Sequence, residues 1–330
     1  MAILANQKVL TLDYWKAARN LQPGDYVFDK DGKIVQVKLV QEYRAQECYE
    51  VTFNDYLTIA GDQHLGFLVE TPKCRTRAAI YKGTRAFKRK LRPRNVSVLT
   101  ETSLRDKRNR FVLSVPTTKP LDLPEQTLPV PPFVFGFWFF NRRKNKRMAA
   151  PRGLAPEIYR QFKDAGYQIT EHHKINTGEK EFSVFPTIES HLAFDIPIKI
   201  PNNYLLASKE QRIELLKGII CSKSRQYAKS KDKFRISCKT QAAILQIQCL
   251  LESLGHRITV QHDPYRSNFT IFFKSRLQLL DNQVSPPIKV HHNRRYIKQI
   301  ETIAPQMCVH IETTGQDNTI LVGEGFIACR

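Results

Sequence analysis

The chain has 330 residues, of which 42% are hydrophobic and 25% charged, a composition typical of a globular protein with two domains or with one domain and a large insertion. Its 52 Lys and Arg residues outnumber its 31 Asp and Glu residues, and the formal net charge of +21 favours polyanionic partners, nucleic acid first. The longest apolar run, FVFGFWFF at 133–140, is far shorter than the roughly 20 residues of a membrane helix, which argues against a membrane-spanning protein.

Both ends of the chain show short strand-like runs separated by turns. Residues 1–72 contain a Pro-Gly turn at 23–24 and an Asp-Gly hairpin signal at 31–32 between apolar runs. Residues 294–330 show the same pattern and finish on an apolar run. We therefore predict β-structure at both ends.

A strongly basic segment at 72–100 follows the first β block. It contains ten Lys and Arg residues and no acidic residue, with Tyr81 and Phe87 among them. Ten cations without a counter-charge repel one another, so we predict that this segment contacts a polyanion. The alternative is a solvated loop that happens to be basic.

The middle of the chain alternates helices and strands, and one order of elements occurs twice. Each time a helix is followed by a second helix that stops at a glycine before a strand, and then by another strand-like run. The ranges are 133–141, 157–173, 181–187, 211–222, 247–263 and 268–275. Gly166 and Gly255 stand where a helix-ending glycine belongs. The order predicts an internal repeat. The alternative is an ordinary alternation of helices and strands without a repeat.

The seven cysteines are odd in number and nowhere form a C-x-x-C pair. This pattern disfavours both a disulfide framework and a zinc site. We expect reduced thiols that act mostly as small buried hydrophobic groups. They are Cys48, Cys74, Cys221, Cys238, Cys249, Cys308 and Cys329.

A β domain interrupted by a duplicated α/β insert resembles an intein, in which a Hint domain carries a LAGLIDADG (DOD-type) homing endonuclease. The resemblance covers nearly the whole chain and is greatest to the inteins of phage terminases and helicases. The matching stretches are LQPGDYVFDKDG, CYEVTFNDYLTIAGDQHLGFLVET, PLDLPEQTLPVPPFVFGFWFFN, IPNNYLLASKEQRIELLKGII, FRISCKTQAAILQIQCLLESLGHRITV, RRYIKQIETI and TILVGEGFIAC.

The resemblance implies an α+β fold class and three segments. The N-terminal part of a Hint-like β domain, including the basic segment, spans 1–120. A degenerate LAGLIDADG endonuclease-like domain spans 121–285, and the C-terminal part of the Hint-like domain spans 286–330.

In such endonucleases two helices pack on each other through small residues, and each ends in an acid that holds a divalent metal. The resemblance places the packing glycines at Gly136 and Gly218, and the two acids at Asn141 and Lys223. Asn offers a cation only a neutral carbonyl and Lys repels it, whereas Mg²⁺ sites for phosphate chemistry depend on carboxylates. We expect the nuclease chemistry to be lost, with no metal and no cofactor. Mg²⁺ is expected only if residual nuclease activity exists.

The splicing positions that the resemblance implies are degenerate too. The first nucleophile, a Cys or Ser in such inteins, aligns with Ala2, and the histidine of the second β block aligns with His64. Arg330 stands where the penultimate histidine is expected, with no terminal Asn. We therefore expect no catalytic residue and interpret His64 as a relic. An engineered chain that lacks its junction residues is the alternative.

The sequence thus predicts a domesticated, catalytically inactive protein, derived from an intein and its homing endonuclease, that binds duplex DNA. It fits a specificity or architectural subunit of a larger, phage-encoded nucleoprotein assembly. The alternatives are an RNA-binding protein on the same scaffold, a residually active homing endonuclease, and a structural protein whose charge sets solubility. We expect protein partners and no membrane partner. The N-terminus lacks a signal-peptide pattern, so we expect a soluble intracellular protein, in the bacterial cytoplasm if phage-encoded.

The predicted nucleic-acid contacts are cations of the basic segment, the two helix ends and the sheets of the repeats. They are Arg75, Arg77, Lys82, Arg85, Lys88, Arg89, Lys90, Arg92, Arg94, Arg142, Arg143, Lys144, Lys174, Lys180, Lys223, Arg225, Arg235, Lys239, Arg257, Arg266 and Lys274.

Overall fold

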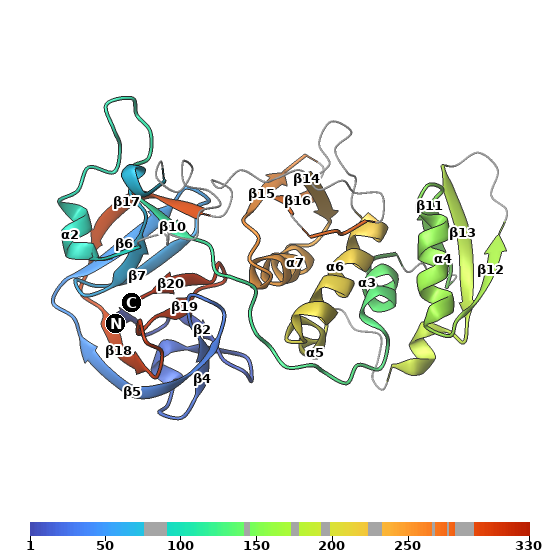
Figure 1. Ribbon diagram of the computed structural model, residues 1–330, viewed down its shortest axis with the longest axis horizontal. Helices are drawn as coiled ribbons and strands as arrows, with labels where there is room; N and C mark the ends of the chain where they lie inside the picture. The colour runs from blue at the N-terminus through green and yellow to red at the C-terminus, as the bar shows by residue number, and fades with distance from the viewer. Residues whose placement is uncertain are drawn as a thin grey trace, which may run out of the picture. The chain divides into compact units, whose positions relative to one another are not determined.

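The computed structural model describes residues 1–75, 91–141, 146–172, 178–192, 199–223, 233–265, 268–275, 277–280 and 294–330, except for the side chain of Lys223. The chain divides into two compact units. Unit 1 comprises Met1–Asp122, Gly255–Arg257 and Lys289–Arg330, and unit 2 comprises Leu123–Leu254 and Ile258–Ile288. The two ends of the chain thus build one unit and its middle builds the other (Figure 1).

Unit 1 consists mainly of short strands, as predicted for both ends of the chain. The strands are β1 (Ala2–Leu4), β2 (Lys8–Leu10), β3 (Trp15–Ala17), β4 (Tyr26–Phe28), β5 (Ile34–Arg44), β6 (Cys48–Phe53), β7 (Thr58–Asp62), β8 (Gly66–Val69), β9 (Arg92–Asn95), β10 (Ser114–Pro116), β17 (Arg294–Ile303), β18 (Met307–Thr313), β19 (Ile320–Val322) and β20 (Ile327–Cys329). The 3-10 helix η1 (Ala18–Asn20) and the short helix α2 (Val96–Thr100) complete the described part.

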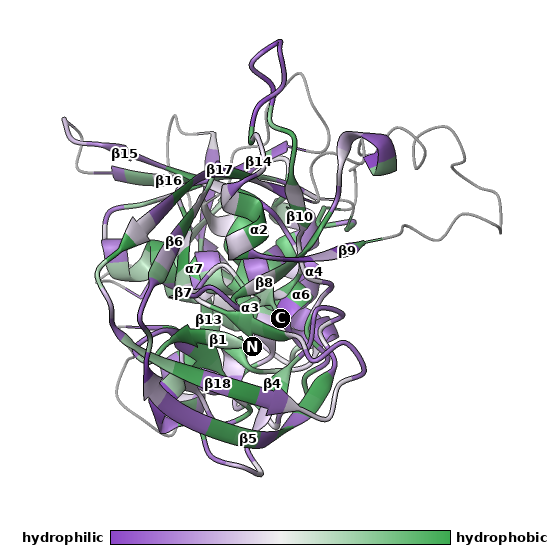
Figure 2. Ribbon diagram, turned by 90° about the vertical axis from the view of Figure 1, so that its left-hand side faces the viewer, coloured by the Kyte–Doolittle hydropathy of each residue, from purple (hydrophilic) through white to green (hydrophobic). Residues whose placement is uncertain are grey.

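The sheets of unit 1 mix strands from both ends of the chain. In the described residues their orders are β1-β18-β5-β4, β10-β17-β6-β7 and β3-β2-β19-β20-β8-β9. Hydrophobic and hydrophilic stretches follow each other along β5, as expected of a half-buried strand (Figure 2). The core combines Val9, Phe53 and Phe67 with Ile297 and Val309 from the other end. Neither end of the chain can therefore form this core alone.

Unit 2 contains the predicted internal repeat. Its elements are α3 (Pro132–Asn141), β11 (Met148–Pro151), α4 (Ala155–Asp164), β12 (Gln168–His172), β13 (Glu179–Phe185), η2 (Ile188–His191), α5 (Asn202–Leu205), α6 (Lys209–Lys223), β14 (Lys233–Cys238), α7 (Gln241–Ser253), β15 (Ile258–Asp263) and β16 (Asn268–Lys274). The order helix, strand, helix, strand, strand begins at α3 and again at α6. The two sheets share one topology as well, β11-β13-β12 and β14-β16-β15. The structure thus confirms the repeat.

The turns after α4 and α7 depend on glycine. Gly166 and Gly255 have φ angles of +86° and +79°, a left-handed conformation that other residues rarely adopt. The sequence-based placement of these helix ends is therefore confirmed. Among the described residues, no helix combines the length and the apolar character needed to cross a membrane.

Candidate functional site

Helices α3 and α6 cross at two glycines. A Cβ at Gly136 would overlap the carbonyl oxygen of Leu215. A Cβ at Gly218 would overlap the carbonyl oxygen of Phe133 and lie 2.8 Å from the backbone nitrogen of Phe137. Because these neighbours are backbone atoms that cannot rotate away, only glycine fits at either position. The helix interior tolerates Gly218 because it lets the two backbones approach.

Asn141 is the last residue of α3, where the resemblance places a metal-binding acid. Its Nδ2 donates a hydrogen bond of 2.6 Å to the carbonyl oxygen of Ala149, and its Oδ1 accepts one of 3.0 Å from the Ala149 N–H. The carboxamide therefore ties the end of α3 to β11. A neutral carboxamide held by two backbone hydrogen bonds supplies no negative charge, so the residue fits a divalent cation poorly.

The corresponding position in the second repeat is Lys223, the last residue of α6. Its side chain lies outside the described part of the structure. So do the cations next to the two helix ends, Arg142, Arg143, Lys144 and Arg225. Within the described ranges, no group of three or more His, Cys, Asp and Glu side chains is placed to hold a metal ion.

Changing Asn141→Asp is expected to lower the free energy of unfolding by about 1–3 kcal/mol at pH 7. The carboxylate cannot donate to the Ala149 carbonyl, which Asn141 now approaches to 2.6 Å. Protonation would restore a donor, so the folded protein should raise the pKa of the new carboxyl above its unfolded value. The loss of stability is therefore expected to shrink as the pH falls toward 5, measured by urea unfolding.

The matched control is Asn141→Ala, which removes both hydrogen bonds but introduces no titrating group. Its loss of stability relative to the wild type should stay constant between pH 7 and pH 5. A parallel pH dependence of the two variants would contradict the hydrogen-bond role assigned to the Asn141 carboxamide.

The sheet of the second repeat has one buried face and one open face. The buried face, covered by α7, carries Phe234, Ile236, Ile271 and Phe273. On the open face Lys233 pairs with Lys274 and Arg235 pairs with Phe272, so three cations and one aromatic residue occupy neighbouring positions of the two strands. A sheet face rich in cations favours a polyanionic partner.

The sheet of the first repeat differs in charge. Phe185 at the end of β13 is 70% exposed, and Glu181 in the same strand lies 3.7 Å from the guanidinium of Arg147. Lys180 does not lie on the open face. Its Nζ is 3.3 Å from Glu171 and 5.9 Å from the ring centre of Tyr159 on α4, on the side that α4 covers. Among the described residues, the predicted cations that lie on an open sheet face therefore belong to the second repeat.

Two of the predicted contacts are held by unit 1 itself. The Arg75 guanidinium donates hydrogen bonds to the carbonyl oxygens of Glu70, Phe111 and Val112 at 2.8–3.3 Å, and burial lowers its pKa. Arg257 is largely buried, 4.0 Å from the Asp55 carboxylate, and desolvation lowers its pKa too. Both guanidinium groups are partly buried against partners in unit 1, which disfavours the role of phosphate contact.

The other predicted cations divide into exposed and undescribed residues. Arg92 and Arg94 are exposed on β9, and Lys239 is exposed after β14. The remaining ones lie outside the described residues: Arg77, Lys82, Arg85, Lys88, Arg89, Lys90, Lys174 and Arg266.

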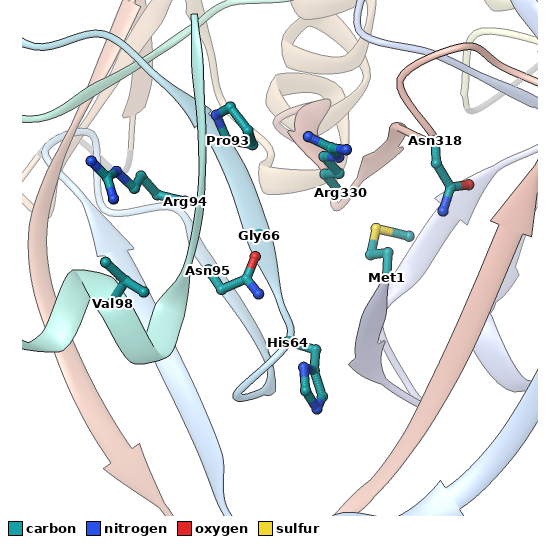
Figure 3. A pocket seen from close by; sticks show the side chains of 9 residues that line it. All are labelled: Met1, His64, Gly66, Pro93, Arg94, Asn95, Val98, Asn318 and Arg330. Atoms are coloured by element: carbon teal, nitrogen blue, oxygen red, sulfur yellow. The ribbon is translucent and has the colours of Figure 1, made fainter.

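The residues at the predicted splicing positions gather in unit 1. His64, Met1 and Arg330 line one pocket of about 480 Å³ (Figure 3). Arg330 exchanges two backbone hydrogen bonds with Gly66, of 2.8 and 2.9 Å. The fold thus brings together residues at predicted splicing positions that are far apart in the sequence.

The chemistry that this pocket offers is limited. Ala2, beside Met1, is fully buried in β1 and presents only a methyl group. The His64 backbone N–H donates to the Asp62 carboxylate at 2.8 Å, but its ring is exposed, with Gln63 Nε2 at 3.3 Å. Cys329 is completely buried, which raises the pKa of its thiol. Burial keeps this thiol from acting as a nucleophile.

No protein-family model matches the chain. The replicative DNA helicase DnaB of Mycobacterium intracellulare is 26% identical to it over 251 residues, which are 74% of this chain. The match covers 40% of the helicase, so the chain spans less than half the length of that relative.

Solved structures similar to this chain include inteins and a homing endonuclease. The MchDnaB-1 intein is 23% identical, with a TM-score of 0.20 and 21% of this chain and 53% of that chain covered. The gp41-1 intein is 18% identical, with a TM-score of 0.23 and coverages of 34% and 74%. The homing endonuclease I-DmoI, in complex with DNA and Mn, is 14% identical, with a TM-score of 0.32 and coverages of 44% and 89%.

The α+β fold class is confirmed by the structure, in which a β unit built from both ends of the chain is interrupted by a unit with an internal repeat. The predicted resemblance agrees with these similarities, which include inteins and a homing endonuclease.

Proposed function

We propose that this chain binds duplex DNA and neither cuts it nor splices itself. The observation that carries the proposal is the open face of the β14-β16-β15 sheet, where Lys233, Arg235 and Lys274 occupy positions next to Phe272 in the strand register. Cations on one face of a small sheet suit the spacing of backbone phosphates. The net charge of +21 supports the same partner through long-range attraction.

The polar residues of this face suit contacts with bases. Ser237 and Thr270 lie opposite each other with hydroxyl oxygens 3.0 Å apart, and Gln261 is exposed beside them on β15. The major groove of B-DNA is about 12 Å wide and admits a β-ribbon, whose side chains can then read base edges. The cations would hold the phosphates while these residues face the bases.

The loss of cleavage is supported by Asn141, whose carboxamide is engaged by Ala149 rather than available to a metal. The loss of splicing is supported by the methyl group of Ala2 at the position of the first nucleophile. A domesticated, phage-encoded subunit that gives specificity or architecture to a larger assembly in the bacterial cytoplasm is the role that we propose for such a protein.

The proposal is tested with the triple variant K233Q/R235Q/K274Q on a fluorescent 30-base-pair duplex. Loss of three phosphate contacts should make the negative slope of log K against log salt shallower by about 2.7 and weaken binding at every salt concentration. The matched control is K163Q/K199Q/K209Q, which removes three exposed cations of unit 2 outside the sheets. Equal slopes for the two triple variants would contradict the proposed face.

Two further measurements distinguish DNA binding from RNA binding and from residual nuclease activity. If structured RNA or single strands compete better than duplex DNA, the exposed aromatic rings of Phe185 and Tyr265 would favour an RNA-binding function, since unpaired bases stack on such rings. Binding should be unchanged by EDTA, and Mg²⁺ should produce no nicks. Metal-dependent nicking by the wild type would establish a residually active endonuclease instead.

A further inference from the structure

Residues 104–112 form a β-hairpin on unit 1 that the basic segment at 72–100 does not include. The Val112 N–H donates to the Leu104 carbonyl at 3.0 Å, and the Asp106 N–H donates to the Arg110 carbonyl at 2.9 Å. Asn109 closes the turn with a φ of +57°, which Asn tolerates better than most residues. The hairpin projects beside α2 in teal in Figure 1, and its tip is hydrophilic in Figure 2.

The hairpin carries four cations and one acid, a net charge of +3. Asp106 is used inside the turn: its carboxylate accepts hydrogen bonds from the backbone N–H groups of Arg108 and Arg110 and from the Arg110 guanidinium, at 2.8–2.9 Å. The bonds from Arg110 lower the pKa of Asp106 to about 2. Lys107 and Arg108 are exposed, and neither side chain has an ion-pair partner among the described residues.

The base of the hairpin is fixed by a column of stacked groups. The Arg105 guanidinium lies 4.3 Å from the ring centre of Phe111, and this ring stacks on Tyr296 at 5.7 Å. Arg75 completes the column, 5.5 Å from the Tyr296 ring centre, and also binds the carbonyls of Phe111 and Val112. Arg75 thus anchors the hairpin. These contacts hold the base of the hairpin on unit 1.

We propose that the hairpin is a second nucleic-acid contact, in which Lys107 and Arg108 at the tip hold phosphates of a duplex. This inference rests on the proposed function and adds a site on unit 1 to the sheet face of unit 2. A preformed turn loses little conformational entropy on binding, so its cations contribute more affinity than those of a flexible loop. Each of the two exposed side chains would contact one phosphate.

The test is the variant K107Q/R108Q in the full chain, measured on the same duplex between 50 and 200 mM salt. Loss of two phosphate contacts should make the negative salt slope shallower by about 1.8 and weaken binding on the order of tenfold. The matched control K33Q/K38Q removes two exposed cations of unit 1 in and before β5 and should bind like the wild type. Both variants should unfold at the wild-type midpoint, because only exposed side chains change.

The outcomes separate this inference from the proposed function. If K107Q/R108Q binds like the wild type while K233Q/R235Q/K274Q binds more weakly, the hairpin inference is wrong and the proposed function stands. If K33Q/K38Q weakens binding as much as K107Q/R108Q, the effect is one of net charge and the hairpin is no site. A wild type that binds no duplex overturns both.

Discussion

Changing Gly218→Ala is expected to destabilise unit 2 by about 3 kcal/mol. The new Cβ would overlap the Phe133 carbonyl oxygen of α3 and lie 2.8 Å from the Phe137 nitrogen, so the helices must separate. Overpacking of this kind costs about 1–3 kcal/mol or more, here against immobile backbone. The better helix propensity of Ala returns only about 1 kcal/mol, and the separation also loosens the packing around the crossing.

The measurement is urea unfolding followed by fluorescence. Trp138 lies in α3 and reports on unit 2, whereas Trp15 lies in unit 1. The control is Gly153→Ala, because a Cβ there would meet no atom within 4 Å, and its stability should change by less than about 0.5 kcal/mol. Coincident unfolding of the two variants would show that close backbone contact at Gly218 does not hold the repeats together.

Changing Arg294→Met is expected to lower the unfolding free energy of unit 1 by about 3–5 kcal/mol. Arg294 Nη1 lies 3.1 Å from Glu70 Oε2, and the two side chains are 2% and 3% exposed. The variant leaves a buried carboxylate without this cation, and a buried charge that loses its partner is strongly destabilising.

The double variant E70Q/R294M removes both charges and serves as the control. It should regain part of the lost stability at pH 7, because no uncompensated charge stays buried. Thermal unfolding of the wild type and both variants at pH 7 measures the effect. A double variant no more stable than Arg294→Met at pH 7 would mean that the destabilisation comes from lost packing and not from the charge.

The sequence pattern predicted the elements whose signals are local. Gly166 and Gly255 mark helix ends because a left-handed residue needs glycine whatever surrounds it. The strand β11 gave no signal, because Met-Ala-Ala-Pro has little strand propensity and becomes a strand only by pairing with β13. The helix α2, with the sequence VSVLT, contains residues that favour strands and was not predicted.

The candidate site was predicted in outline but not in detail. Lys233 was not recognised as a companion of Arg235 and Lys274, because the register that joins β14 to β16 is set by residues far apart in the chain. Arg75 was assigned to a polyanion by its charge. Its acceptors include the carbonyl of Val112, 37 positions away, and composition carries no sign of such a partner.

The pairing of β10 with β17 brings together the two strands between which the chain is interrupted. Pro116 lies opposite Arg294 in neighbouring antiparallel strands, whose paired Cα atoms are about 5 Å apart. A tight turn of a few residues could therefore join the two strands directly. A chain shortened in this way would keep the β10–β17 pairing, but it would lose residues 117–122 and Gly255–Arg257, which also belong to unit 1.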